Sequence, residues 1–315
     1  MTWQYGVAGA VGVTMTLAVG VAAATAWIEL PLQSGSASES STVVYMDPDI
    51  SWTPERPGEG RLFRIQVTAS EHSPIMGLRG EVAGEELHFR RLDDRTFESI
   101  AAAPVGVGDT IAGAVRVAFT AGGEEAFEVR IPVTHAEYAH EELQVAPRFG
   151  SPPNAEDQAR LARDQEMARE ASRIAHRTPQ AWSDSVVMPR NARVTSGFGD
   201  GREFNGQISS RHLGLDLQGQ RGDTVVAATR GVVVLVAPFL LAGNIVYLNH
   251  GAGLLSAYFH LSSQLVQVGD TVQAGEAIGL VGATGRVTGP HLHWVVRYGR
   301  TSVDPRSLIE VLGSI

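Results

Sequence analysis

The heptapeptide RHLGLDL, residues 211–217, decides how the C-terminal part of the chain folds. Gly214 at its centre disfavours a helix, so the stretch is expected to form a β-strand. In a strand, alternation places His212 and Asp216 on one face and the three leucines on the other. An apolar back and a polar front predict a functional site on the surface of a sheet.

Two later stretches show the same alternation. In PHLHW, residues 290–294, the two histidines share one face while the leucine and the tryptophan point into a core. In YFHL, residues 258–261, the tyrosine and the histidine fall on one side. Each stretch alone occurs by chance, whereas all three within about eighty residues of one strand-rich segment indicate a single site.

The residue types in these stretches are metal ligands. The chain has no cysteine, so disulfides and thiolate zinc sites are excluded and a metal would be held by histidine and carboxylate. A catalytic zinc commonly takes three protein ligands and keeps one position for water. His212, Asp216 and one histidine of the PHLHW pair would supply the three ligands.

Charge and length limit the class of protein. The formal net charge of -9 excludes the usual nucleic-acid binder, which needs an excess of Lys and Arg to neutralise phosphates. A chain of 315 residues with 43% hydrophobic content is expected to form more than one domain. Short Val-rich runs separated by Gly and Pro predict a mainly β protein.

Upstream of the histidine stretches, residues 43–134 alternate apolar and polar side chains, as in LFRIQV at 62–67. Short strands at this spacing predict an N-terminal immunoglobulin-like β-sandwich. Residues 135–182 are interpreted as a helical linker, and residues 183–315 as the domain that carries the site. The tetrapeptide GDTV occurs at 222–225 and again at 269–272, which indicates a duplicated hairpin in that domain.

The linker contains one strong helix signal. Asn154 is an N-cap residue with Asp157 in the first turn, and residues 155–176 are charged and rich in alanine. The simplest interpretation is a helical spacer that packs on its neighbour through Leu161, Met167 and Ile174.

The N-terminus carries an export signal. Residues 6–27 are apolar and uncharged, long enough to cross a bilayer at about 1.5 Å per residue. Residues 1–28 are therefore interpreted as a cleaved signal peptide or an uncleaved membrane anchor, and residues 29–42 as a flexible spacer. Both alternatives predict a protein that works outside the cytoplasm, and the second adds the membrane as a partner.

At its histidine stretches the sequence resembles the M23 family of metallopeptidases, also called the lysostaphin or LytM family. The resemblance covers residues 188–305 and includes TSGFG at 195–199 and TGPHLHW at 288–294. It implies an antiparallel β-sheet groove of the LytM or duplicated hybrid motif type. It also implies one zinc ion per chain, bound by His212, Asp216 and His293.

The same resemblance implies roles for the remaining histidines. His260 and His291 would act on water and on the tetrahedral intermediate, as a base and an oxyanion-stabilising group do. His250 would be a structural histidine in a turn. The implied activity is a zinc-dependent endopeptidase that cuts peptides of bacterial peptidoglycan.

Two other functions stay open at this point. Some members of the family lack turnover and activate other wall hydrolases, so a catalytically weak scaffold is the leading alternative. A protease for other extracellular proteins would share the chemistry and differ in substrate. The sandwich and linker are expected to set the reach of the enzyme, to occlude its groove, or to bind an envelope regulatory protein.

Overall fold

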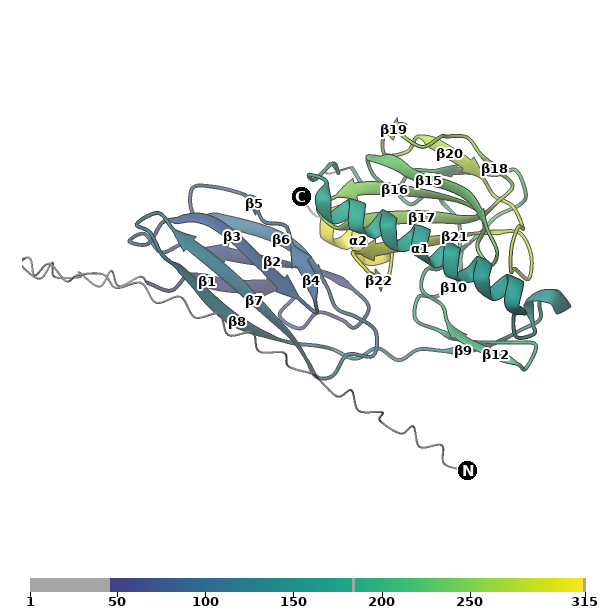
Figure 1. The fold of residues 1–315 in the computed structure, drawn as a ribbon, viewed down its shortest axis with the longest axis horizontal. Helices are drawn as coiled ribbons and strands as arrows, with labels where there is room; N and C mark the ends of the chain where they lie inside the picture. The colour runs from purple at the N-terminus through teal and green to yellow at the C-terminus, as the bar shows by residue number, and fades with distance from the viewer. Residues whose placement is uncertain (1–45, 183–184, 314–315) are drawn as a thin grey trace, which may run out of the picture. The chain divides into compact units, whose positions relative to one another are not determined.

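The alternating residues of the N-terminal part form two antiparallel sheets, in a computed structural model that describes residues 46–182 and 185–313 (Figure 1). One sheet has the order β1-β2-β6-β5, with β1 (Asp49–Thr53), β2 (Leu62–Thr68), β6 (Thr96–Ala102) and β5 (Arg90–Arg91). The other has the order β4-β3-β7-β8, with β4 (Glu85–Leu87), β3 (Ile75–Val82), β7 (Thr110–Phe119) and β8 (Glu124–Pro132). Side chains of both sheets, among them Phe63, Ile65 and Ile131, share one buried core. The chain therefore builds a β-sandwich here, while its assignment to the immunoglobulin class stays a prediction.

The expected signal peptide or anchor and the expected spacer lie outside the described residues. Within 46–182 and 185–313, neither helix combines the length and the apolar character that crossing a membrane requires.

The largest sheet lies in the C-terminal part and has the order β10-β13-β21-β17-β16-β15-β19, with β22 paired to β21. Its strands are β10 (Val194–Ser196), β13 (Leu215–Gln218), β21 (His291–Tyr298), β17 (Leu254–Leu261), β16 (Gly243–Gly251), β15 (Gly231–Phe239), β19 (Thr271–Val272) and β22 (Thr301–Val303). All of these pairings are antiparallel. The mainly β, antiparallel fold that the sequence predicts is confirmed.

Two small sheets flank the large one. The first consists of β14 (Thr224–Val226), β20 (Ala277–Leu280) and β18 (Ser263–Gln264). The second consists of β12 (Ile208–Arg211), β11 (Gly201–Phe204) and β9 (His140–Leu143). Because β9 comes from the segment interpreted as a helical linker, that interpretation is wrong at these residues. Strand β9 pairs in parallel with β11, so it is part of a sheet in the C-terminal domain.

The repeated GDTV tetrapeptide forms two turns of the same geometry. Gly222 and Gly269 have φ values of 94° and 98°, a region that glycine enters without a Cβ penalty. The carboxylates of Asp223 and Asp270 each accept a hydrogen bond from the backbone N–H three residues earlier, at 2.7 and 2.9 Å. The sequence repeat therefore has a local physical cause, an aspartate-stabilised turn before a strand.

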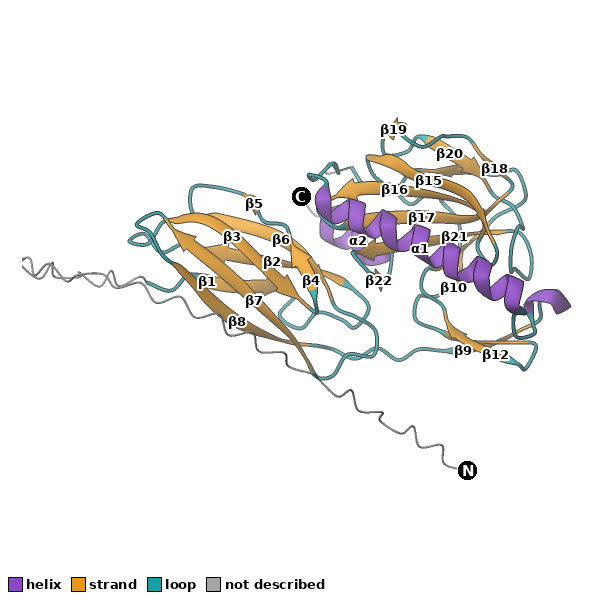
Figure 2. Ribbon diagram, in the orientation of Figure 1, coloured by secondary structure: helices purple, strands orange, loops and turns teal. Residues whose placement is uncertain are grey.

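Helix α1 (Ala155–Arg177) begins where the sequence predicts, because the Asn154 side chain accepts the Asp157 N–H at 2.9 Å. Its packing differs from the expectation. The residues that pack on the sheet are small, namely Ala168, Ala171 and Ala175, while Met167 is 42% exposed. Alanines let the helix backbone come close to β15, β16 and β17, so α1 covers that sheet face and is not a free spacer (Figure 2).

The sandwich and the C-terminal part also share apolar packing. Helix α2 (Arg306–Leu312) buries Leu308 and Leu312 in a cluster that includes Leu62 of β2. The Leu62 N–H donates to the Ser307 hydroxyl at 3.0 Å. A short 3-10 helix (Pro147–Phe149) lies between β9 and α1.

Candidate metal centre

Three polar side chains meet where β13 and β21 run side by side. The register pairs Asp216 with His293, so both lie on the same face of adjacent strands. Asp216 Oδ1 lies 2.7 Å from His293 Nδ1 and 3.1 Å from His212 Nε2, and these two nitrogens are 2.9 Å apart. Three such atoms this close together fit one ion, since zinc bonds to nitrogen and oxygen are about 2.0–2.2 Å long.

The unprotonated nitrogen of His212 is directed into this cluster. Its Nδ1 donates to the Gly197 carbonyl, which leaves the Nε2 lone pair facing Asp216 and His293. Such a hydrogen bond fixes both the tautomer and the ring orientation of a metal-binding histidine. The donor set of two imidazole nitrogens and one carboxylate oxygen therefore fits a zinc site with three protein ligands.

His212 reaches the cluster differently from the prediction. It lies in the connection between β12 and β13, not in one strand with Asp216, and Leu213 is 41% exposed instead of joining the core. A Cβ at Gly214 would lie 2.6 Å from the Trp294 carbonyl oxygen and 2.7 Å from the His293 ring. The chain must therefore pass close to β21 at this glycine, and that passage breaks the expected alternation. Leu215 and Leu217 are fully buried, as expected.

His260 faces the cluster because strand β17 contains a β-bulge. Val246 pairs with Tyr258, and Asn244 pairs with Leu261. Between these two pairs β17 advances by three residues while β16 advances by two, so β17 has one extra residue. His260 lies in this bulge and has φ of 61°, an uncommon conformation for a residue with a Cβ. The prediction that Tyr258 and His260 share a side is wrong. Tyr258 is buried, and its hydroxyl accepts the Ala228 N–H at 2.8 Å.

His260 and His291 present the same nitrogen to the groove. The Nδ1 of His260 donates to the Thr284 carbonyl at 2.8 Å, and the Nδ1 of His291 donates to the Gly289 carbonyl at 2.9 Å. Both Nε2 atoms are thereby left without the proton in the neutral rings. The ring centroids are 4.9 Å apart, and His291 Nε2 lies 3.6 Å from Asp216 Oδ1.

The charges of the site are set by burial and by the Asp216 carboxylate. Burial tends to raise the pKa of Asp216, but its close contacts with His212 and His293 outweigh burial, so this pKa is far below the ordinary value. Burial lowers the pKa of His293 to about 4. Burial, together with the nearby His291 and His293, places the pKa of His260 well below 6.5. Without a bound cation, Asp216 is thus ionised while His293 and His260 are neutral at pH 7.

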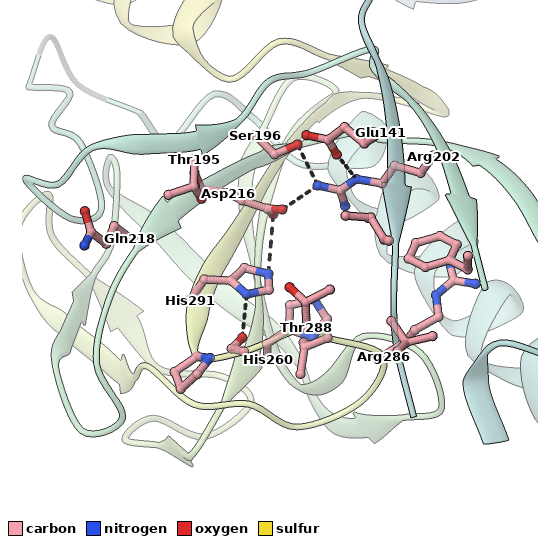
Figure 3. A pocket seen from close by; sticks show the side chains of 16 residues that line it. Glu141, Thr195, Ser196, Arg202, Asp216, Gln218, His260, Arg286, Thr288 and His291 are labelled. Atoms are coloured by element: carbon pink, nitrogen blue, oxygen red, sulfur yellow. Dashed lines mark hydrogen bonds and ion pairs between the residues drawn. The ribbon is translucent and has the colours of Figure 1, made fainter. Parts of the chain in front are cut away.

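Asp216 is surrounded by residues to which no sequence pattern pointed. The Arg202 guanidinium donates to Asp216 Oδ2, to Ser196 Oγ at 2.7 Å and to Glu141 Oε2 at 2.9 Å (Figure 3). Glu141 lies on β9, some sixty positions earlier in the chain than Arg202. No spacing rule connects these residues, and the parallel pairing of β9 with β11 brings them together.

The cluster opens into a groove of about 290 Å³ whose walls carry charge. Glu141, Arg202 and Arg286 line it together with His260 and His291 (Figure 3). The Arg286 guanidinium lies over the Phe204 ring at 3.9 Å, and burial with the nearby Arg202 lowers its pKa to about 10. Arg286 therefore remains a cation at neutral pH and faces the space next to the histidines.

His250 lies apart from this groove. It is fully buried, its Nδ1 donates to the Arg230 carbonyl at 2.8 Å, and its Nε2 lies 2.8 Å from the Ser256 hydroxyl. Both ring nitrogens thus hold neighbouring segments together, as expected of a structural histidine, but His250 lies near the end of strand β16 and not in a turn as predicted.

Replacing Arg202 by methionine should weaken metal binding about tenfold. The guanidinium holds Oδ2 of Asp216 and so directs Oδ1 toward the two histidines, and losing such a partner of a metal ligand typically costs 10–100-fold in affinity. Competition with a chromogenic chelator measures the affinity, with Arg221→Met at an exposed arginine as the matched control. Equal affinities in the two variants would contradict the role of Arg202.

Comparisons with known proteins agree on one family. The model of peptidase family M23 matches residues 210–305. Over 118 residues the chain is 38% identical to the peptidoglycan DD-endopeptidase ShyC of Vibrio cholerae, covering 37% of this chain and 27% of ShyC. Over 105 residues it is 46% identical to ShyA of the same organism, covering 32% of this chain and 24% of ShyA. The chain thus covers about a quarter of the length of these curated relatives.

A solved structure resembles a larger part of the chain. The crystal structure of a candidate M23 peptidase from Pseudomonas aeruginosa superposes with a TM-score of 0.61 at 25% identity. The superposition covers 81% of this chain and 95% of that one, so the similarity extends beyond the matched 96 residues to upstream elements.

Proposed function

Because residues 210–305 of the chain form a peptidase family M23 domain, we propose that the protein is a zinc-dependent endopeptidase that hydrolyses peptide bonds of bacterial peptidoglycan. The observation that carries the proposal is the convergence of His212, Asp216 and His293 next to the groove that Asp216, His260 and His291 line. The substrate class is proposed from ShyC and ShyA, which are peptidoglycan DD-endopeptidases. Action on the cell wall places the protein outside the cytoplasm.

His212, Asp216 and His293 would hold the zinc ion. Zinc supplies a Lewis acid that polarises a carbonyl group and lowers the pKa of water to about 7. The chain itself supplies proton transfer and positioning. His260 is assigned as the base, because its Nδ1 hydrogen is engaged by Thr284 and the lowered pKa of its ring leaves Nε2 free to take a proton.

His291 is suited to the complementary task. It is less buried than His260, and its Nε2 lies 3.6 Å from Asp216 Oδ1. With a proton on Nε2, His291 would donate to the oxygen of the tetrahedral intermediate and afterwards to the leaving amine. Arg286 would bind a carboxylate of the stem peptide, because it is a cation that faces the groove.

Digestion of insoluble peptidoglycan tests the function. Purified protein, with its zinc content measured, is incubated with cell walls, and mass spectrometry identifies the released fragments. New amino termini are expected, and they should vanish with a chelator and in His291→Ala while persisting in His72→Ala, which changes an exposed histidine of the sandwich. Intact walls with zinc fully bound would favour the scaffold that activates other hydrolases. Cleavage of extracellular proteins alone would change the substrate class.

A further inference from the structure

A second group of metal-binding side chains lies far from the groove, between the sandwich and helix α1. His88 follows β4 in the sandwich, and His176 lies in the last turn of α1. His88 Nε2 and His176 Nδ1 are 2.8 Å apart. A carboxylate oxygen of Glu86 completes a group whose ligand atoms all lie within 4.8 Å of one another.

The protonation of His176 suits a metal ligand. Its Nε2 lies 3.3 Å from Glu85 Oε2, so the ring donates there and leaves the Nδ1 lone pair facing His88. Glu85 is fixed in turn, because its Oε1 accepts the Arg300 N–H at 3.0 Å. A carboxylate that orients the far nitrogen is the usual environment of a metal-binding histidine.

The surroundings hold the His176 ring in one place. A Cβ at Gly299 would lie 2.4 Å from its Nε2, and a Cβ at Gly253 would lie 2.8 Å from its Cε1. The Tyr298 ring packs against the imidazole edge-on, with centroids 5.6 Å apart, and its hydroxyl donates to the Glu86 carbonyl at 2.6 Å. The imidazole and the Glu86 backbone are therefore positioned by the same strand, β21, and the turn that follows it.

The distance between the His88 and His176 nitrogens is close to that between the His212 and His293 nitrogens near the groove. His212 Nε2 and His293 Nδ1 lie 2.9 Å apart, against 2.8 Å for His88 and His176. Glu86 is exposed, so its side chain can rotate toward the pair without disturbing packed residues. Two imidazoles and one carboxylate, with water at a fourth position, are the donors that zinc and neighbouring transition metals prefer.

We propose that Glu86, His88 and His176 bind a second divalent transition-metal ion, of which zinc is the expected one. Because the ligands come from both the sandwich and helix α1, the bound ion would tie the two together and stabilise the folded chain. This site is independent of the chemistry in the groove.

Counting bound zinc tests the second site. The full chain is stripped of metal, titrated with Zn²⁺ against a chromogenic chelator, and compared with His88→Gln, which removes an imidazole ligand but retains a polar group. The wild type is expected to bind one more zinc ion than His88→Gln, whereas His72→Gln, at an exposed histidine of the sandwich, should match the wild type. Equal counts in the wild type and His88→Gln would overturn the proposal.

A surface variant covers the case in which His88→Gln fails to fold. Glu86→Gln changes an exposed side chain and should weaken the second zinc about tenfold or more, with the far-ultraviolet circular dichroism unchanged. Unchanged affinity in Glu86→Gln would count against the site. His212, Asp216 and His293 are present in every variant. If they did not bind zinc, the number of bound zinc ions would fall equally in all proteins, and the difference between the wild type and His88→Gln would still report on the second site.

Discussion

Replacing His212 by alanine should lower peptidase turnover by on the order of 10³-fold or more and remove the zinc from the groove. His212 is 2% exposed, and its Nε2 contacts both Asp216 and His293, so the substitution removes one of the three converging ligand atoms. Two ligands cannot match the affinity of three, and the Lewis acid is lost with the ion. Zinc content and release of peptidoglycan fragments are measured on the same preparation.

A control separates this effect from misfolding. Truncating a buried histidine leaves a cavity, so thermal unfolding of His212→Ala is compared with that of the wild type in the presence of chelator. His72→Ala serves as the matched exposed variant and should keep both zinc and turnover. Turnover within tenfold of the wild type in a folded His212→Ala protein would refute the assignment of this residue as a ligand.

Substitution of His260 is expected to cause the second large loss of turnover. Unlike the substitution of His212, it should leave the zinc bound. Replacing His260 by asparagine should reduce turnover about 10²–10⁴-fold, the usual contribution of a general base, while the zinc content stays at the wild-type value. Asparagine is chosen because His260 has φ of 61°, and asparagine tolerates this region better than alanine. The backbone bulge should therefore persist in the variant.

Measuring both zinc content and turnover of His260→Asn shows whether His260 is a metal ligand or a base. If His260→Asn loses zinc along with turnover, His260 is a ligand and the proposed split of roles is wrong. If the variant keeps both, proton transfer belongs to His291 or to water. A parallel His291→Asn variant shows which histidine carries the larger part of the rate.

Several local features were predictable because they depend on neighbours in the chain. The Asn154 cap, the two GDTV turns and the burial of Leu292 and Trp294 follow from hydrogen bonds or alternation within a few residues. The fold class followed from the same short-range patterns. The resemblance at the histidine stretches pointed to the five groove residues, which the structure brings together.

Other expectations failed where distant segments decide the geometry. Alternation placed Leu213 in the core and Tyr258 beside His260, but the close approach at Gly214 and the bulge at His260 break the period of two. The buried face of α1 uses alanines instead of Met167, because the sheet beneath comes close to the helix backbone.

The sequence by itself determined that the chain is mainly β, since residue type and short spacing set strand formation, and it indicated histidines and one aspartate as candidate metal ligands. The tertiary structure alone decided which partners hold these residues. Arg202 reaches Asp216 and Glu141 only because β9 pairs with β11, and His88 meets His176 only because β4 lies against the end of α1. Contacts between residues so far apart in the chain depend on the packing of whole elements, which no local pattern encodes.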